Sequence, residues 1–331
     1  MILHLNKNTP TEILNDLKSN DQAFINEKDE YIQVINSSSY KKVNIHISKY
    51  IIEQYIFESD LQLGSIAYKP SRLIKVNDLE IGRGSNKFPV IMGPCSVESQ
   101  GQMEQVGDFL NKMKLKCVRG GTYKPRTSPY SFQGLESNGL NILNLIGEKH
   151  QLTTFTEVKD ATQINEVIAK ADVVQVGAKS MYDHGILKAL GDCNKPVLLK
   201  RGFSTTLQEF VQAAEFILCR GNSNVILCER GIRTFENKTR FTLDLCGVAW
   251  LKKHTNLPII IDPSHAMGYR YGIIDLSKAA VAMGVDGLLI EIHPNPEKAL
   301  SDASQQLNFS EAKVLLDTIK PYLEIEKKII S

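Results

Sequence analysis

Residues 196–231 contain PVLLKRG (196–202), LQEFVQAAEFIL (207–218) and NVILCERG (224–231). The first and third segments are near-continuous runs of Val, Ile and Leu, which are typical of parallel strands covered on both faces. The middle segment has the apolar spacing of a helix. The stretch therefore predicts a unit in which a helix connects two parallel strands.

The same alternation extends from about residue 88 to the C-terminal end. The other candidate strands are PVIMGPC (89–95), KCVRGG (116–121), TTFTEV (153–158), DVVQVG (172–177), PIIIDPSH (258–265) and GLLIEIH (287–293). Eight such β/α units over roughly 240 residues match the size of a (β/α)8 barrel. A doubly wound open sheet is the alternative, and it would have fewer strands or leave some without a helix.

Residues 1–75 follow another pattern. The predicted elements are a strand (1–6), a helix from about residue 11, a hairpin (23–29 and 30–35), a helix KYIIEQYIFESD (49–60) and a last strand SIAYKPSRLIKV (65–76). This β-α-β-β-α-β order predicts a small α+β ferredoxin-like domain. We therefore expect this domain over 1–75 and the barrel over 76–331, with a hairpin in 77–87 closing the bottom of the barrel.

Composition narrows the function classes. The net charge of +2 gives no broad field for nucleic acid or an anionic membrane. No apolar run approaches the roughly 18 residues that cross a bilayer. The six cysteines form no C-x-x-C pair, and the N-terminal residues do not resemble a secretory signal. We therefore expect a soluble cytoplasmic protein with no nucleic-acid or membrane partner.

Ionisable residues gather at the C-terminal ends of the predicted strands, where the chemistry of such barrels is found. They are Cys95, Arg119, Glu157, Lys179, Lys200, Arg201, Glu229, Arg230, Asp262, His265, Glu291 and His293. Burying so many of these groups at one face requires a partner or a ligand for each. This face is therefore the predicted active site.

One subset has the chemistry of metal ligands. Cys95, His265, Glu291 and Asp302 offer a thiolate, an imidazole and two carboxylates from the first, seventh and eighth strands and the following loop. Taken singly, a strand-end Cys is usually a small hydrophobe, and a lone His is more often a hydrogen-bonded structural residue. Together they predict a mixed site for a divalent transition metal ion.

A second subset is cationic. It comprises Arg119, Lys124, Arg126, Lys179, Lys200 and Arg230. So many cations beside one metal repel strongly, which implies substrates with several negative charges, such as two phosphorylated small molecules. The run RGGTYKPRTS (119–128) is suited to holding anions, and a solvated basic turn is its alternative. No G-x-x-x-x-G-K-[ST] loop is present, which disfavours a nucleotide.

With these residues in place, nearly the whole chain resembles 3-deoxy-D-arabino-heptulosonate-7-phosphate (DAHP) synthase, of the subtype with an N-terminal ferredoxin-like regulatory domain. The motifs that carry the resemblance are GPCSVES (93–99), RGGTYKPRTSPYSFQGL (119–135), LLKRGFS (198–204), ILCERGIRTFE (226–236), IDPSH (261–265) and IEIHPNPEKALSDASQQL (290–307). The resemblance implies an aldol-like condensation of phosphoenolpyruvate with erythrose 4-phosphate, the first step of the shikimate pathway to aromatic amino acids. A metal ion would act as Lewis acid on the aldehyde.

The resemblance also assigns roles. It implies that Cys95, His265, Glu291 and Asp302 bind Mn²⁺ or a similar transition metal. It implies that phosphoenolpyruvate is contacted by Arg119, Lys124, Ala178, Lys179, Lys200 and Arg230, with Glu157 a weaker match. It implies that Arg126, Thr127, Ser128 and Asp262 contact erythrose 4-phosphate. Lys124, Lys200, His265 and Asp262 are the expected catalytic residues, with the general acid and base left open.

Some alternatives remain. The KPRTS run favours erythrose 4-phosphate, whereas the related 3-deoxy-D-manno-octulosonate 8-phosphate synthase typically has Ala-Asn-Arg-Ser-Ser after its Lys. Lys179 replaces a common Arg and loses its bidentate fork, and Met267 can narrow the acceptor pocket. A synthase for another aldose phosphate and a non-catalytic regulatory homologue are the alternatives.

The N-terminal domain has two interpretations. By resemblance it binds tyrosine or phenylalanine between neighbouring subunits of a homotetramer and limits access to the barrel. The alternative is a domain that only holds subunits together.

Overall fold

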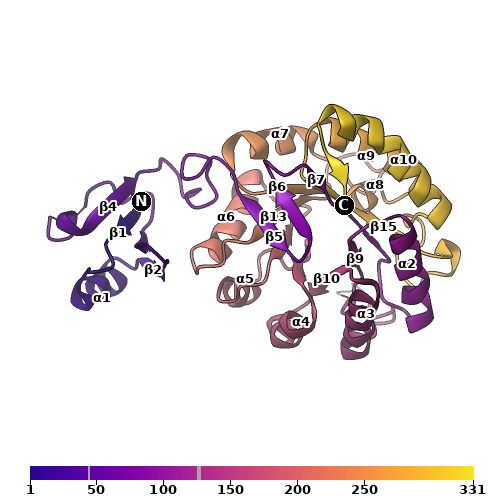
Figure 1. Ribbon diagram of the computed structural model, residues 1–331, viewed down its shortest axis with the longest axis horizontal. Coiled ribbons are helices and arrows are strands. Elements are labelled where there is room, and N and C mark those ends of the chain that lie inside the picture. Colours follow the sequence, from indigo (N-terminus) through magenta and orange to yellow (C-terminus); the bar gives the residue numbers. More distant parts are fainter. Residues whose placement is uncertain (44, 125–127) are drawn as a thin grey trace.

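The computed structural model describes residues 1–43, 45–124 and 128–331. Arg126 and Thr127, two of the residues expected at the acceptor, lie outside the described residues. A small antiparallel sheet and a larger barrel make up the chain, and Figure 1 shows them as two parts joined by a linker. Among the described residues, no helix is long and apolar enough to span a membrane. All six cysteines are free thiols.

All eight predicted barrel strands are present. In chain order they are β8 (Val90–Gly93), β9 (Cys117–Arg119), β10 (Thr153–Val158), β11 (Val173–Val176), β12 (Val197–Lys200), β13 (Val225–Glu229), β14 (Ile259–Ile261) and β15 (Gly287–Glu291). Each strand pairs in parallel with the next, and β15 pairs with β8, for example Leu288 with Val90, so the sheet closes. A closed sheet excludes the doubly wound alternative.

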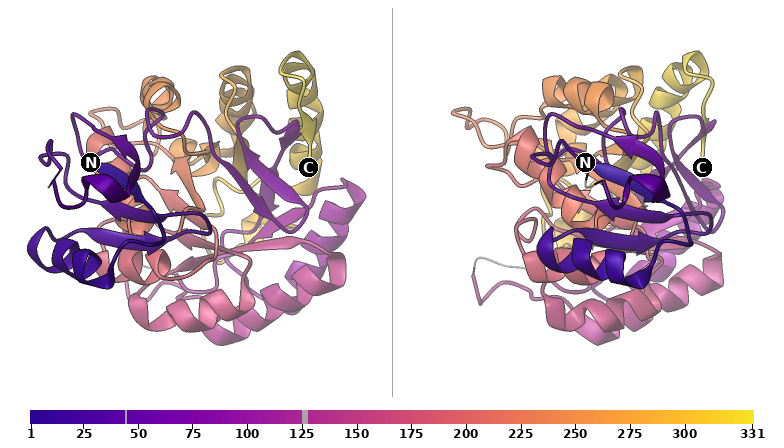
Figure 2. Two further views of the ribbon diagram at one scale, coloured as in Figure 1. Left: turned by 60° about the vertical axis from the view of Figure 1, so that its left-hand side comes forward. Right: turned by 90° about the vertical axis from the view of Figure 1, so that its left-hand side faces the viewer.

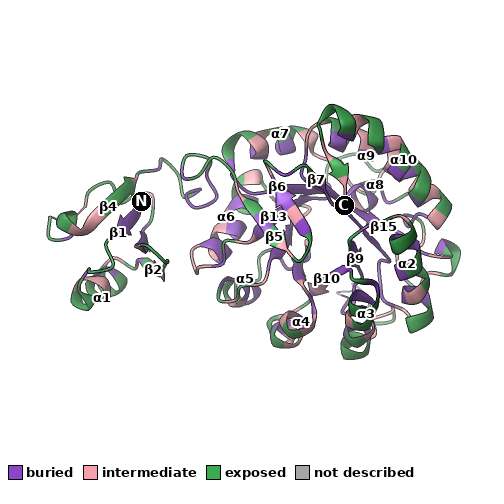
Figure 3. Cartoon of the chain, in the orientation of Figure 1, coloured by how far each residue is buried: buried purple, intermediate pink, exposed green. Residues whose placement is uncertain are grey.

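Helices surround the barrel (Figure 1). They are α2 (Gln100–Lys112), α3 (Glu136–His150), α4 (Ile164–Lys170), α5 (His184–Gly191), α6 (Leu207–Leu218), α7 (Leu245–His254), α8 (Pro263–Met267), α9 (Ile273–Ala282) and α10 (Phe309–Ile325). Side-chain caps mark the starts of several of them; at α6, for example, Thr206 and Glu209 form a capping box. The helices are exposed on their outer faces and the barrel strands are buried, as Figure 3 shows.

The barrel interior is filled by side chains and closed at one end by a hairpin. The hairpin consists of β5 (Leu73–Val76) and β6 (Leu79–Gly82), which pair antiparallel. Ile74, Leu79 and Ile81 are fully buried in the same cluster as the inward side chains of the barrel strands. The floor hairpin was predicted in 77–87 and lies instead over 73–82, while β7 (Lys87–Phe88) pairs with the C-terminal β16 (Ile329–Ile330).

The N-terminal part is a four-stranded antiparallel sheet with one helix. Its elements are β1 (Ile2–Leu5), α1 (Thr11–Asn20), β2 (Phe24–Glu27), β3 (Ile32–Ile35), the 3-10 turn η1 (Ser48–Tyr50) and β4 (Ile51–Tyr55). The strands lie in the order β2-β3-β1-β4. This arrangement is compatible with a ferredoxin-like module.

Two predicted elements of this part are wrong. The segment predicted as a helix over 49–60 forms η1 and the edge strand β4, because its β-branched residues favour a strand that pairs with β1, for example Ile51 with Leu5. Of the last strand predicted over 65–76, only β5 is extended, and it belongs to the barrel floor. The predicted boundary at residue 75 therefore falls inside the floor hairpin.

The linker between the two parts is bonded to the barrel. The carboxylate of Glu215, on α6, accepts the backbone N–H groups of Gln62 (2.9 Å), Leu63 (3.2 Å) and Gly64 (2.7 Å). Burial raises the pKa of Glu215 to about 7, although these three donors oppose that rise. The side chain of Arg72 donates to the carbonyl of Leu63 at 2.9 Å. These bonds hold the N-terminal sheet beside the barrel, in front of it in the right-hand view of Figure 2.

Candidate active site

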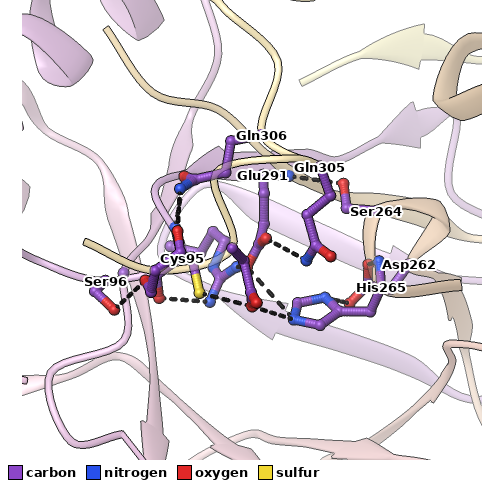
Figure 4. A network of polar contacts seen from close by, with 12 residues as sticks. Cys95, Ser96, Asp262, Ser264, His265, Glu291, Gln305 and Gln306 are labelled. Atoms are coloured by element: carbon purple, nitrogen blue, oxygen red, sulfur yellow. Dashed lines mark hydrogen bonds and ion pairs between the residues drawn. The ribbon is translucent and has the colours of Figure 1, made fainter. Parts of the chain in front are cut away.

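Three neighbouring strands bring the predicted metal ligands together. Cys95 lies two residues beyond β8, Glu291 is the last residue of β15, and His265 lies in α8 directly after β14. Since β15 pairs with both β8 and β14, the three side chains meet at one end of the barrel. Figure 4 shows Glu291 between Cys95 and His265. Asp302 joins them from the loop before α10, with its backbone in the left-handed region at φ 48°.

Three of the four side chains are spaced as metal ligands are, and His265 lies beside two of them. Donor atoms of Cys95, Glu291 and Asp302 all lie within 4.8 Å of one another. Cys95 Sγ is 3.2 Å from Asp302 Oδ2, and His265 Nε2 is 3.4 Å from Glu291 Oε1 and 4.0 Å from Asp302 Oδ2. Ligands at ordinary bond lengths around a tetrahedral ion are separated by ~3.4 Å. The donor set and its spacing therefore fit a divalent transition ion.

Asp262 fixes the orientation of His265. Its Oδ2 atom accepts a hydrogen bond from His265 Nδ1 at 2.7 Å, which leaves Nε2 facing Glu291. A carboxylate on the far nitrogen is the usual partner of a metal-binding histidine. The same Oδ2 atom is 2.5 Å from Lys200 Nζ, and Oδ1 accepts the backbone N–H of His265. Both oxygens of Asp262, the residue expected at the acceptor, are thus engaged by protein donors.

Two buried cations touch the ligand set directly. Arg119 Nη1 is 2.5 Å from Glu291 Oε1. Lys124 Nζ donates to the Cys95 carbonyl at 2.9 Å and lies 3.2 Å from its Sγ. Arg119 Nε is a buried nitrogen without a hydrogen-bond partner among the described residues. Because unpaired buried donors are costly and rare, this nitrogen indicates an anionic ligand.

The surroundings shift the pKa values of the ligands. Burial raises the pKa of the Cys95 thiol to about 12, so without a metal the thiol is protonated and donates to Asp302. Burial lowers the pKa of His265, which favours the neutral imidazole that binds metals. Burial alone would raise the pKa of Glu291, but His265 and Arg119 hold it below its ordinary value. A metal that binds here therefore displaces the thiol proton.

The other predicted residues are buried to different degrees. Arg230 is buried, with its guanidinium 4.1 Å from the centre of the Phe241 ring, and burial lowers its pKa. Glu157 accepts a hydrogen bond from Gln175 at 2.6 Å. Ala178 is half-buried, while Lys179 and Ser128 are exposed.

Met267, the residue expected to narrow the acceptor pocket, is the last residue of α8. Its side chain is buried in the hydrophobic core, and a Cβ atom on Gly272 would lie 2.7 Å from its sulfur.

Three functional candidates were missed by sequence reasoning. Gln305 donates to Glu291 Oε2 at 2.6 Å, Gln306 accepts from the backbone N–H of Cys95 at 2.9 Å, and Arg240 contacts Asp302. The two glutamines lie in the motif IEIHPNPEKALSDASQQL (290–307), but neutral amides carry no charge signal. Arg240 lies eleven residues beyond the end of β13, so its position along a strand does not mark it.

Comparisons with known proteins point to one family of enzymes. The profile of the DAHP synthetase I family matches residues 65–325. The phospho-2-dehydro-3-deoxyheptonate aldolase of Thermotoga maritima is 46% identical over 248 residues, which cover 75% of this chain and 73% of that protein. The 2-dehydro-3-deoxyphosphooctonate aldolase of Fusobacterium nucleatum is 30% identical over 273 residues, 77% of this chain and 95% of that protein.

Solved structures show the same likeness. A crystal structure of the Thermotoga maritima DAHP synthase superposes with a TM-score of 0.81 at 37% identity, covering 100% of this chain and 99% of that one. A truncated form of the synthase from the same organism superposes with a TM-score of 0.75 at 40% identity, covering 81% of this chain and 98% of that one.

Proposed function

Since the chain belongs to the DAHP synthetase I family, we infer that it condenses phosphoenolpyruvate with erythrose 4-phosphate to give DAHP and phosphate. The observation that carries this function is the cluster of Cys95, Glu291 and Asp302 beside the buried Arg119 and Lys124. It combines a metal-binding donor set with the positive charge that two phosphorylated substrates require.

We propose that Cys95, His265, Glu291 and Asp302 bind Mn²⁺ or a similar divalent transition metal. A metal bound there supplies a Lewis acid for the aldehyde oxygen of the acceptor. Asp262 keeps His265 in the tautomer that presents Nε2 to the ion.

We propose that the cationic side chains around this centre bind phosphoenolpyruvate. Arg119 has a free buried Nε donor, and Lys124 and Lys200 each carry an ammonium group at the end of a barrel strand or just beyond it. Arg230 is buried and its guanidinium packs against the ring of Phe241, and such a planar fork is suited to binding a phosphate or carboxylate. Ala178, Lys179 and Glu157 complete the assignment.

The acceptor is assigned to Arg126, Thr127, Ser128 and Asp262. Lys124, Lys200, His265 and Asp262 are the proposed catalytic residues, since each lies within or directly beside the donor cluster. Lys200 Nζ is 3.5 Å from His265 Nδ1, on the side of the imidazole opposite the Nε2 atom that faces Glu291.

Acceptor kinetics test this function. We expect kcat/KM for erythrose 4-phosphate to exceed that for ribose 5-phosphate or arabinose 5-phosphate by about 100-fold, because the KPRTS run (124–128) resembles that of synthases for the four-carbon acceptor. Release of phosphate is measured for each acceptor with phosphoenolpyruvate, before and after chelation of metal. A preference for arabinose 5-phosphate would instead identify an octulosonate-forming enzyme, and equal rates after chelation would contradict the metal assignment.

We also propose that the N-terminal sheet regulates the barrel in a cytoplasmic homotetramer, with tyrosine or phenylalanine as effector. The linker bonds to Glu215 give a physical route, because they tie the N-terminal sheet to α6. We place the N-terminal domain at residues 1–56, since its last strand, β4, ends at Tyr55, while residues 62–64 bond to the barrel and β5 forms its floor.

Removal of residues 1–56 is expected to abolish inhibition by tyrosine or phenylalanine, which we expect to be about tenfold in the full chain. The truncated relative from Thermotoga maritima, which aligns with 81% of this chain, supports a barrel that folds alone. Inhibition is measured for both proteins under the same substrate concentrations. Inhibition of the truncated protein equal to that of the full chain would refute the regulatory role.

A further inference from the structure

Arg240 and Gln305 form a pair that contacts both carboxylates of the candidate metal centre. Arg240 Nη1 donates to Gln305 Oε1 at 2.7 Å and lies 3.4 Å from Asp302 Oδ1. Gln305 Nε2 in turn donates to Glu291 Oε2 at 2.6 Å, and Figure 4 shows Gln305 beside Glu291. Arg240 thus contacts Asp302 directly, and it contacts Glu291 through the buried amide of Gln305.

In Glu291 and in Asp302 the two carboxylate oxygens have different partners. Glu291 directs Oε1 to His265 and Asp302 directs Oδ2 to Cys95 and His265, so these two oxygens face the ligand cluster. The other oxygen of each carboxylate, Oε2 or Oδ1, is held by the pair of Arg240 and Gln305. This division fixes the rotation of both carboxylates with one oxygen toward the ion.

The side-chain amide of Gln305 is held in one orientation. Its side chain is 1% exposed, and both ends of its amide are used, the oxygen by Arg240 and the nitrogen by Glu291. An amide in this position holds a carboxylate without adding charge, whereas a second carboxylate would repel Glu291. The orientation of the amide depends on the arginine that donates to its oxygen.

The backbone of Arg240 is fixed by its contacts with the end of α8. Its backbone N–H donates to the carbonyl of Met267 at 3.1 Å. Gly268 ends α8 with φ 76°, and a Cβ atom there would lie 2.6 Å from the Cβ of Arg240. The next residue, Phe241, packs against the guanidinium of Arg230. Residues 240 and 241 therefore link the metal centre to an arginine assigned to phosphoenolpyruvate.

We propose that Arg240 and Gln305 are positioning residues that hold Glu291 and Asp302 in the orientation that binds the metal, and thereby set its affinity. The inference rests on the proposed metal centre. Outer partners of metal ligands typically contribute about 10- to 100-fold to metal affinity. The side chain of Arg240 is 41% exposed, so solvent screens its repulsion of the ion, and the loss of its hydrogen bonds dominates when it is replaced.

Cobalt binding tests the proposal independently of turnover. Co²⁺ is titrated into the chelator-treated full-length protein, and the dissociation constant is obtained from the thiolate-to-cobalt charge-transfer absorbance. We expect Gln305→Leu to weaken Co²⁺ binding by about 10- to 100-fold and Arg240→Lys, which keeps the charge, by about tenfold. Thermal unfolding of the metal-free proteins reports whether the fold is intact.

Arg233→Lys is the matched control. Arg233 lies in the same loop and stacks on Phe203 at 5.0 Å, and the same substitution there is expected to leave Co²⁺ affinity unchanged. Co²⁺ affinity within twofold of the unmodified protein for both Gln305→Leu and Arg240→Lys would overturn the proposal, as would an equal loss in Arg233→Lys. If Gln305→Leu does not fold, Arg240→Lys alone decides. An unmodified protein that binds no Co²⁺ would overturn the metal centre itself.

Discussion

Replacing Cys95 by alanine is expected to lower kcat by about a thousandfold or more, because Lewis-acid stabilisation by a metal contributes several kcal/mol to the transition state. Cys95 supplies the only sulfur in the described donor cluster, and its Sγ lies 3.2 Å from Asp302. Without the thiolate, the remaining ligands are one imidazole and two carboxylates, which favour a harder and more weakly held ion. Turnover is measured with excess Mn²⁺, together with the metal content of the purified protein.

Cys228→Ala is the matched control for this substitution. Cys228 is also fully buried, and it lies in the hydrophobic interior of the barrel. Its loss is expected to cost about 1 kcal/mol of the free energy of unfolding through the small cavity it leaves, with kcat unchanged. Full activity of Cys95→Ala in a metal-replete assay would contradict the assignment of Cys95 as a ligand.

The barrel strands were predictable because each is buried on both faces. Such strands carry runs like PVLLKRG (196–202) that neither a surface helix nor a half-exposed strand tolerates. The N-terminal part was predicted less well because β4 is an edge strand with exposed side chains on both faces. Its apolar spacing fits a helix equally well, and its pairing with β1, about fifty residues away, decides the outcome.

The residues of the candidate site also differ in how far the sequence predicts them. Cys95, His265 and Glu291 were predictable because each lies at or just beyond a strand end, and strand ends meet in a barrel. The role of Gln305 depends on a hydrogen bond to Glu291, and that of Arg240 on a loop which folds back over α8. Neither contact follows from local pattern, so the residues that orient the ligands required the structure.

Replacing Asp262 by asparagine is expected to lower the free energy of unfolding by about 3–5 kcal/mol, because Lys200 then remains buried without a counter-charge. Burial alone would raise the pKa of Asp262, but His265 and Lys200 hold it well below its ordinary value, so the carboxylate is charged at neutral pH. Asparagine keeps the shape and removes that charge. The free energy of unfolding is measured by denaturant titration of metal-free protein.

The same substitution is expected to weaken Co²⁺ binding, because asparagine can present its amide nitrogen to His265 Nδ1 and so favour the wrong tautomer. Asp286→Asn is the control: Asp286 is a buried carboxylate bonded to the backbone of Ile259 at the start of β14, at the opposite end of the barrel. Its replacement changes stability without changing Co²⁺ affinity. If Asp262→Asn loses stability but keeps its Co²⁺ affinity, Asp262 acts only as the counter-ion of Lys200. If the variant loses both stability and Co²⁺ affinity, the charge on Asp262 also fixes the orientation of His265.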